Sequence, residues 1–198
     1  MIEIREYMKG CEIATRGINY ETSTSYHTPE KRELLWLLYH DYYPMFSRRD
    51  CFVALDTWEG AQTKSGKGER VVGYILCEPS FNNWERNYTK CFMPKLEKLS
   101  PEHAKMRHEE FEHYREIAKE YPAHLHINIL PEFQGQGIGG RLIGALEAHL
   151  IKKGVRGVHL TTSVKKVPSI KLYERNGYEL KAQFDGGVLL FAKKLIKE

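Results

Sequence analysis

Residues 127–142 read Ile-Asn-Ile-Leu-Pro-Glu-Phe-Gln-Gly-Gln-Gly-Ile-Gly-Gly-Arg-Leu, an alternating apolar strand pattern followed by a glycine-rich turn and an apolar helix pattern. Four glycines fall within the six positions from Gly135 to Gly140. A helix start leaves backbone N–H groups without partners and carries partial positive charge. Glycine lets a ligand approach that backbone closely. The stretch therefore predicts a cradle for a pyrophosphate group.

Two familiar phosphate sites do not fit this turn. The spacing Gly135-x-Gly137-x-x-Gly140 matches the dinucleotide fingerprint, which expects an acidic residue about 20 positions later. Residues 155–160, Val-Arg-Gly-Val-His-Leu, contain no acid, and residues 141–198 are too few for the rest of a doubly wound domain. A nucleotide phosphate loop is excluded because no Gly-Lys-Ser/Thr follows.

The remaining pattern predicts an α/β chain. Apolar residues alternate or run together in the expected strands and recur at helical spacing in the expected helices. The first expected strand contains Ile2 and Ile4. The other expected strands span residues 51–55, 71–77, 123–130, 155–162 and 188–194. The expected helices are a run capped by Thr28 and ended by Pro44, a helix from the glycine turn to Gly154, and 169–175. Residues 57–70 read as a hairpin loop. This order predicts a sandwich around one mixed sheet.

Residues 81–121 differ from the rest in their many charges and sparse apolar stripe. Pro79, Pro94 and Pro101 punctuate the stretch, and Ser100-Pro101-Glu102 is a typical helix start. We expect an inserted helical segment. Two interpretations are open: a lid stabilised by its own packing, or a cover for one side of a substrate pocket.

Composition limits the class of protein. The 198 residues, 41% hydrophobic and 28% charged, fit a single globular domain over 1–198. The net charge of +4 lies in scattered lysine pairs, which argues against nucleic-acid binding. No apolar stretch approaches a membrane span and the N-terminus lacks a signal-peptide core, so a cytoplasmic protein without a membrane partner is expected. Four scattered cysteines argue against a zinc ribbon or a disulfide scaffold.

The stretch 127–142 resembles the acetyl-CoA motif of the GNAT superfamily of N-acetyltransferases, a strand, then Gln/Arg-x-x-Gly-x-Gly/Ala, then a helix. A second stretch, Ile-Lys-Leu-Tyr-Glu-Arg-Asn-Gly-Tyr at 170–178, resembles the family's "LYEKxGF" segment. The resemblance is close over 123–180 and extends to the first 80 residues only in element order. The His-Leu-His and Gly-Val-His-Leu strands and the long insertion also resemble bacterial acetyltransferases related to the acetyltransferase-like domain of O-GlcNAcase.

This resemblance implies a GNAT-like α/β/α sandwich around one mixed, mostly antiparallel sheet with a splayed central strand pair. It implies acetyl-CoA as co-substrate and no metal. In the family the strand before the turn pairs with the pantetheine arm, and the turn holds the pyrophosphate. The matching positions are Ile127, Asn128, Ile129, Gly135, Gln136, Gly137, Ile138, Gly139 and Gly140.

The resemblance also implies how acetyl transfer proceeds. Tyr173 matches the tyrosine that protonates the leaving thiolate, and a phenol with a pKa of about 10 suits that task. Many family members use a glutamate as general base, but this strand offers His124 and His126 and no carboxylate before Glu132. The sequence leaves the choice between the two histidines open, because a strand bulge changes which residues face the substrate.

Some positions depart from the family pattern. Lys166 stands where an asparagine often contacts the coenzyme, and it is either a solvated lysine or a phosphate contact. Asn128 stands where the O-GlcNAcase-like relatives often carry an aspartate. A zinc site from His124, His126 and His159 is not expected, since no acidic or thiol ligand accompanies them at a recognised spacing.

The expected function is acetyl transfer to a primary amine, carried by a small molecule or a peptide, in a ternary complex of a monomer or homodimer. The alternative is a non-catalytic acyl-CoA-binding or regulatory module with the same fold, because the strand lacks an evident acidic base.

Overall fold

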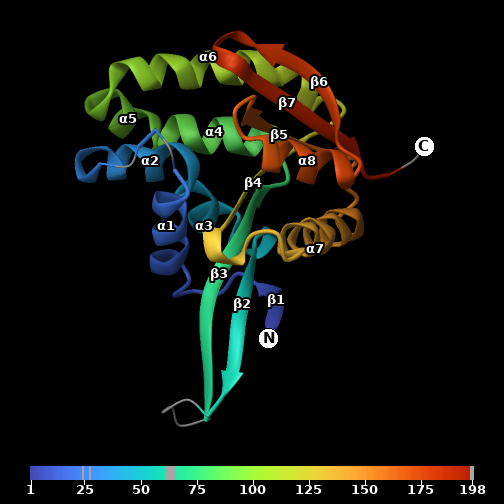
Figure 1. Cartoon of the computed structure of the whole chain (residues 1–198). Helices are drawn as coiled ribbons and strands as arrows, with labels where there is room; N and C mark the ends of the chain where they lie inside the picture. Colours follow the sequence, from blue (N-terminus) through green and yellow to red (C-terminus); the bar gives the residue numbers. More distant parts are fainter. Residues whose placement is uncertain (24, 27, 61–65, 197–198) are drawn as a thin grey trace. The chain divides into compact units, whose positions relative to one another are not determined.

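The computed structural model describes residues 1–23, 25–26, 28–60 and 66–196 (Figure 1). Its strands form one seven-stranded sheet in the order β1-β2-β3-β4-β5-β7-β6. The ladders β1–β2, β2–β3, β5–β7 and β6–β7 are antiparallel, and β4–β5 is parallel. The expected mixed, mostly antiparallel sheet of an α/β protein is therefore confirmed. The splaying of the central strand pair stays a prediction.

The strands are β1 (Ile2–Glu6), β2 (Phe52–Glu59), β3 (Lys67–Glu78), β4 (Ala123–Ile129), β5 (Gly157–Ser163), β6 (Glu179–Phe184) and β7 (Val188–Lys194). The α-helices are α1 (Glu12–Glu21), α2 (Arg32–Tyr39), α3 (Tyr42–Phe46), α4 (Phe81–Cys91), α5 (Met93–Leu99), α6 (Pro101–Ala118), α7 (Ile138–Lys152) and α8 (Val167–Arg175). Short 3-10 turns are η1 (Pro29–Lys31), η2 (Arg48–Asp50), η3 (Pro131–Phe133) and η4 (Asp185–Gly187). None of the helices in the described ranges is long and apolar enough to cross a bilayer.

The chain divides into two compact units. The first comprises Met1–Leu76 and His126–Leu146, and the second comprises Cys77–Leu125 and Glu147–Glu198. Both strands β3 and β4 begin in one unit and end in the other. The expectation of a single domain over 1–198 with an insertion stays a prediction.

In the first unit, β3 has a bulge at the point where it contacts the end of β4. Ala54 pairs with Gly73 and Leu55 pairs with Val71, so Val72 is the extra residue. The carbonyl oxygen of Val72 accepts a 2.9 Å hydrogen bond from the N–H of Leu130, just past the end of β4. A Cβ added at Gly73 would lie 3.2 Å from the Asn128 carbonyl oxygen. The absence of a side chain at Gly73 therefore lets β4 approach β3 closely.

The hairpin between β2 and β3 is longer than the sequence predicts. Residues 57–59 and 67–70 were expected to lie in a loop, but 57–59 pair with 67–69 and Arg70 pairs with Asp56, and this ladder extends as a two-stranded arm beyond β1 (Figure 1). The ring of Trp58 covers Gly68, where a Cβ would clash with it, and this packing favours the extended ladder. Residues 61–65, also assigned to the loop, lie outside the described residues.

The helical part of the first unit also departs from expectation. The run predicted to end at Pro44 stops at Tyr39, and Pro44 lies inside the first turn of α3, where a proline is tolerated. Helix α1 was not predicted, because two of its inward positions, Thr15 and Asn19, are buried polar residues. They hide the apolar periodicity that normally reveals a helix.

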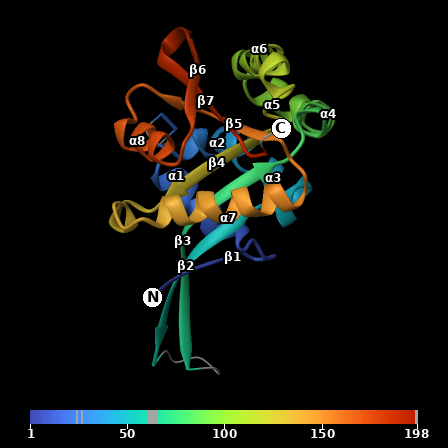
Figure 2. The same ribbon diagram turned by 90° about the vertical axis from the view of Figure 1, so that its right-hand side faces the viewer.

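In the second unit, α4, α5 and α6 occupy the stretch expected to be helical and lie beside one another (Figure 2). Their inner face is aromatic: the Trp84 ring centroid lies 4.8 Å from that of Phe111. Arg107, only 2% exposed, lies over Trp84 and Tyr88 and forms an ion pair with Glu110. A buried guanidinium is tolerated because it is paired and stacked on rings.

The C-terminal strands complete the second unit. Strand β7 occupies the predicted range Val188–Lys194 and pairs with β5 along its whole length. Strand β6 was not predicted, since Glu179–Phe184 is mostly exposed and carries little apolar alternation. The half-buried ion pair between Lys193 and Glu147, 2.7 Å, ties β7 to the end of α7.

Buried His159 on β5 gives the stability of the fold a specific pH dependence. It is fully buried and its Nδ1 lies 2.7 Å from the Tyr121 carbonyl oxygen, to which Nδ1–H donates. Burial lowers its pKa to about 4. The unfolded chain, with a histidine pKa of about 6.5, binds a proton between these values that the folded chain does not. Stability is therefore expected to fall by up to about 3 kcal/mol as pH decreases from about 6.5 to about 4.

This dependence can be measured by urea unfolding between pH 7 and pH 4 for the native chain and for His159→Asn, whose amide can replace the Nδ1–H donor without titrating. The variant is less stable at every pH because it leaves a cavity, so the slope is the informative quantity. Equal slopes for the two proteins would show that His159 does not titrate in this way.

Candidate functional site

The glycine-rich turn joins β4 to α7 in the first unit. Gly135 and Gly137 have φ values of +75° and +76°, the left-handed region that favours glycine. A Cβ at either position would meet nothing within 4 Å, so backbone conformation and not crowding requires glycine here. Both residues are exposed, and α7 begins directly afterwards at Ile138. Gly139 and Gly140 lie in the first turn of α7.

Side chains fix this turn from within the first unit. Gln134 donates from Nε2 to the Ile129 carbonyl oxygen at 2.9 Å, and Gln136 donates from Nε2 to the Glu132 carbonyl oxygen at 3.1 Å. Arg70 forms a 3.1 Å ion pair with the Glu132 carboxylate. Because both glutamine side chains bond to the main chain, the groups that the turn presents are chiefly backbone N–H groups at the start of a helix. Such groups bind anions.

The strand before the turn carries the positions expected to contact the pantetheine arm. Ile127, Asn128 and Ile129 are each partly exposed. The Asn128 side chain donates from Nδ2 to the Tyr74 hydroxyl oxygen at 2.7 Å. Side chains alternate along a strand, so Ile127 and Ile129 point to the face opposite His126 and Asn128.

The two candidate general bases lie in different surroundings. His124, in the second unit, is 2% exposed and stacks on Trp84 with ring centroids 4.5 Å apart. His126, in the first unit, is partly exposed and meets the rings of Tyr39 and Tyr43 edge-on, with centroids 5.7 and 5.4 Å away. His126 is therefore the more accessible of the two residues, although its Nε2 atom is buried.

The remaining candidates lie around α8 in the second unit. Tyr173 is 6% exposed, with ring centroids 6.1 Å from Tyr178 and 5.9 Å from Phe191. Burial raises the pKa of Tyr173 well above its ordinary value. Lys166 is an exposed residue at the start of α8, and its carbonyl accepts from the N–H of Ile170 at 3.1 Å. Partial desolvation of its amine lowers the pKa of Lys166.

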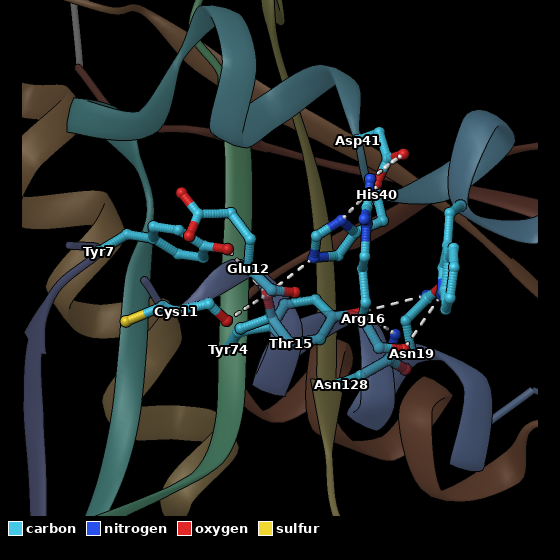
Figure 3. A network of polar contacts seen from close by, with 11 residues as sticks. Tyr7, Cys11, Glu12, Thr15, Arg16, Asn19, His40, Asp41, Tyr74 and Asn128 are labelled. Atoms are coloured by element: carbon cyan, nitrogen blue, oxygen red, sulfur yellow. Dashed lines mark hydrogen bonds and ion pairs between the residues drawn. The ribbon is translucent and has the colours of Figure 1, made fainter. Parts of the chain in front are cut away.

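A buried polar network in the first unit escaped the sequence analysis (Figure 3). Tyr74, on β3, accepts hydrogen bonds from Asn128 and also from Asn19 Nδ2 at 3.1 Å. Burial raises the pKa of the Tyr74 hydroxyl well above its ordinary value. The His40 ring meets the Tyr74 ring edge-on, with centroids 5.9 Å apart and an interplanar angle of 88°.

His40 itself is held at both ring nitrogens. Its Nδ1 lies 3.0 Å from Asp41 Oδ1, and its Nε2 lies 2.8 Å from Thr15 Oγ1. Arg16 donates to both Asp41 oxygens at 2.8 and 2.6 Å. Although burial of Asp41 alone would raise its pKa, the bonds from His40 and Arg16 outweigh it and the pKa is lowered. Thr15 and His40 are buried, so the hydrogen bonds that join His40 to Asp41 and Thr15 stabilise the fold of the first unit.

No cluster of three or more histidine, cysteine, aspartate or glutamate side chains suited to a metal ion occurs in the described ranges. The four cysteines are free thiols, of which only Cys91 is exposed.

Comparison with known proteins decides the family. The model of the acetyltransferase (GNAT) family matches residues 17–178. The chain belongs to this family. The match includes the turn, β4 and α8, which agrees with the two stretches that carry the resemblance.

The individual relatives share little sequence identity with this chain. An acetyltransferase of Sodalis glossinidius, SG1711, is 32% identical over 73 residues, which are 37% of this chain and 49% of that protein. The chain thus matches about half the length of this curated relative. The crystal structure of SsHAT superimposes with a TM-score of 0.82 at 23% identity, covering 99% of both chains.

A second solved structure is PaiA N-acetyltransferase from Thermoplasma acidophilum in complex with coenzyme A. Its TM-score is 0.57 at 16% identity, covering 98% of this chain and 99% of that one. These likenesses support the GNAT fold. Kinship with the O-GlcNAcase-like subgroup stays a prediction.

The turn geometry yields a paired stability prediction. Gly137→Ala is expected to destabilise the GNAT fold by roughly 1–2 kcal/mol, because alanine resists a positive φ. Gly144→Ala, in the middle of α7, is expected to stabilise it by roughly 0.5–1 kcal/mol. A Cβ meets nothing within 4 Å at either position, so crowding does not contribute. Urea unfolding of both variants measures the difference, and equal effects would contradict the left-handed turn.

Proposed function

We propose that this GNAT-family protein is an acetyl-CoA-dependent N-acetyltransferase that transfers an acetyl group to a primary amine in a ternary complex. The observation that carries the proposal is the exposed turn with left-handed Gly135 and Gly137 at the start of α7. Backbone N–H groups there, with the positive end of the helix dipole, suit a pyrophosphate. We propose the N–H groups of Gln136, Ile138, Gly139 and Gly140 as its ligands, with Lys166 as a further phosphate contact.

The acceptor amine, on a small molecule or a peptide, must lose a proton to attack the thioester. We propose that His126 accepts this proton from the ammonium. The only carboxylate close in sequence beyond β4 is that of Glu132, which is already paired with Arg70. A neutral imidazole is a competent base near neutral pH. His124 is the weaker candidate, because its ring is buried against Trp84.

Transfer forms a C–N bond and breaks the C–S bond of the thioester, and the thiolate then needs a proton. We propose that Tyr173 donates it. The attacking nitrogen loses its second proton as the amide forms, and this proton, passed through water, restores the phenol, while His126 releases its proton to solvent. Burial raises the pKa of Tyr173, which keeps its phenol protonated through the physiological range and also makes it a weaker acid toward the thiolate. Bound acetyl-CoA supplies the acetyl group, and Ile127, Asn128 and Ile129 are proposed to pair with its pantetheine arm.

A thiol-release assay over a panel of amines tests the proposal. The native protein is expected to release free coenzyme A with at least one amine, and Tyr173→Phe to lower kcat by about 100-fold while leaving the coenzyme Kd unchanged. Tyr178→Phe is the matched control, since Tyr178 is a buried tyrosine of the same unit. Tight coenzyme binding without thiol release from any amine would favour the non-catalytic binding module. An equal loss in Tyr178→Phe would assign both effects to structure.

The role of His126 is tested by the pH dependence of kcat/KM. The kcat/KM of the native protein is expected to fall toward acid pH, as the imidazole of His126 becomes protonated. His126→Gln is expected to lower kcat by about 100-fold and to abolish this limb, leaving only the titration of the amine. Retention of the limb in His126→Gln would transfer the role of base to another group.

A further inference from the structure

We propose that Tyr74 is a positioning residue for the coenzyme-binding strand: its hydroxyl holds the Asn128 side chain away from the backbone of β4. The inference rests on the proposed function, because it concerns the strand that is to pair with the pantetheine arm. Tyr74 contacts neither the coenzyme nor the acceptor in this proposal and acts through Asn128.

The contacts converge on one oxygen. Tyr74 is 0% exposed, and its Oη accepts from Asn128 Nδ2 at 2.7 Å and from Asn19 Nδ2 at 3.1 Å. The first bond fixes a side chain of β4, and the second comes from helix α1. The preceding residue, Gly73, admits the Asn128 carbonyl so closely that a Cβ would lie 3.2 Å from it. Two consecutive positions of β3 therefore lie against Asn128: Gly73 lies close to its carbonyl, and Tyr74 bonds its side chain.

The hydroxyl matters because of what an asparagine side chain does otherwise. Asparagine amides readily bond to nearby backbone N–H and C=O groups and compete with their other partners. The residues on either side of Asn128 are Ile127 and Ile129, whose backbone groups are proposed to bond the pantetheine amides; of these, the Ile129 carbonyl oxygen already accepts from Gln134 Nε2. With its Nδ2 bonded to Tyr74, the Asn128 amide is committed away from them. Removing the Tyr74 hydroxyl frees it to compete with the coenzyme.

The position of Tyr74 is itself well defined. The His40 ring lies edge-on to it, and the bonds to Asp41 and Thr15 fix that ring. Since the Asp41 carboxylate can only accept, Nδ1 of His40 carries a proton; its Nε2 lies in hydrogen-bond reach of the Thr15 hydroxyl, which also lies 3.0 Å from the Cys11 carbonyl oxygen. Thr15 Oγ1 in turn lies 2.7 Å from the Tyr7 hydroxyl. The His40 ring is therefore the part of this network that supports the Tyr74 ring, and the Tyr7 hydroxyl lies two hydrogen bonds further away.

The Asn19 side chain gives independent evidence that the hydrogen bonds at the Tyr74 hydroxyl are not optimised for stability alone. Its Nδ2 is used by Tyr74, while its Oδ1 is buried with no hydrogen-bond partner in the described part of the chain. A buried acceptor without a partner is costly, and such costs concentrate at functional sites. Its amide is oriented for Tyr74 despite that cost.

Tyr74→Phe and Tyr7→Phe form a matched pair. Each removes one buried hydroxyl from the first unit without changing the ring, but only the Tyr74 hydroxyl contacts β4. We expect Tyr74→Phe to raise the Kd for coenzyme A, measured by calorimetry, about tenfold, the value of one to two lost hydrogen bonds. Tyr7→Phe should change it less than about twofold while losing comparable thermal stability.

Kinetics separate positioning from a general loss of structure. At saturating acetyl-CoA and amine, Tyr74→Phe should keep its kcat within about twofold and show the tenfold effect in the KM for acetyl-CoA. In an Asn128→Ala background, Tyr74→Phe should have no further effect on coenzyme affinity, because the side chain through which it acts is gone. If Tyr74→Phe does not fold, Asn19→Ala replaces it, with an expected rise in Kd of about threefold.

An unchanged Kd in Tyr74→Phe, an equal rise in Tyr7→Phe, or full additivity with Asn128→Ala would overturn the inference. Failure of the native protein to bind coenzyme A is a different result, which would reject the proposed function itself. Binding with the native affinity in both tyrosine variants would leave the proposed function standing and remove Tyr74 from it.

Discussion

The approach of β4 to β3 at Gly73 is the constraint on which the first unit depends. A side chain there would press on Ile129 Cγ1 at 3.0 Å and on the Asn128 carbonyl at 3.2 Å. Because the bulge at Val72 turns its carbonyl toward Leu130, the end of β4 is fixed just where the chain must enter the glycine turn. The strand, the turn and the helix start are thus placed by backbone contacts, which tolerate little displacement.

That rigidity suits a site made of backbone groups. A cradle built from side chains can adjust rotamers to its ligand, but N–H groups at a helix start point where the helix axis directs them. The side chains of Gln134 and Gln136 stabilise the turn by donating hydrogen bonds to the backbone carbonyls of Ile129 and Glu132, which precede it. Arg70 adds a charge-assisted tie to Glu132 and lies 5.8 Å from the Phe133 ring centroid. These contacts fix the turn without a ligand, so little ordering cost would remain at the proposed phosphate site.

The sequence predicted those elements whose apolar period or glycines are required by the fold. Strand β7, the glycine turn and α7 could be read directly, since their apolar period or their glycines are required by the fold. Helix α1 could not, because Thr15 and Asn19 face inward and find partners in His40 and Tyr74, residues 25 and 55 positions away. Only tertiary structure shows that these polar residues are buried. Strand β6 was missed for the opposite reason: its residues are mostly exposed and need no apolar period.

The two histidines of β4 show the same limit at the level of chemistry. Alternation places His124 and His126 on one side of a strand, and as residue types they are equivalent bases. Their neighbours differ: Trp84 of α4 stacks on His124, whereas tyrosine edges from α2 and α3 border His126. Those neighbours come from distant parts of the sequence, so no local pattern could distinguish the pair. A histidine packed face-on against indole belongs to a core, whereas His126, bordered by ring edges, stays partly exposed.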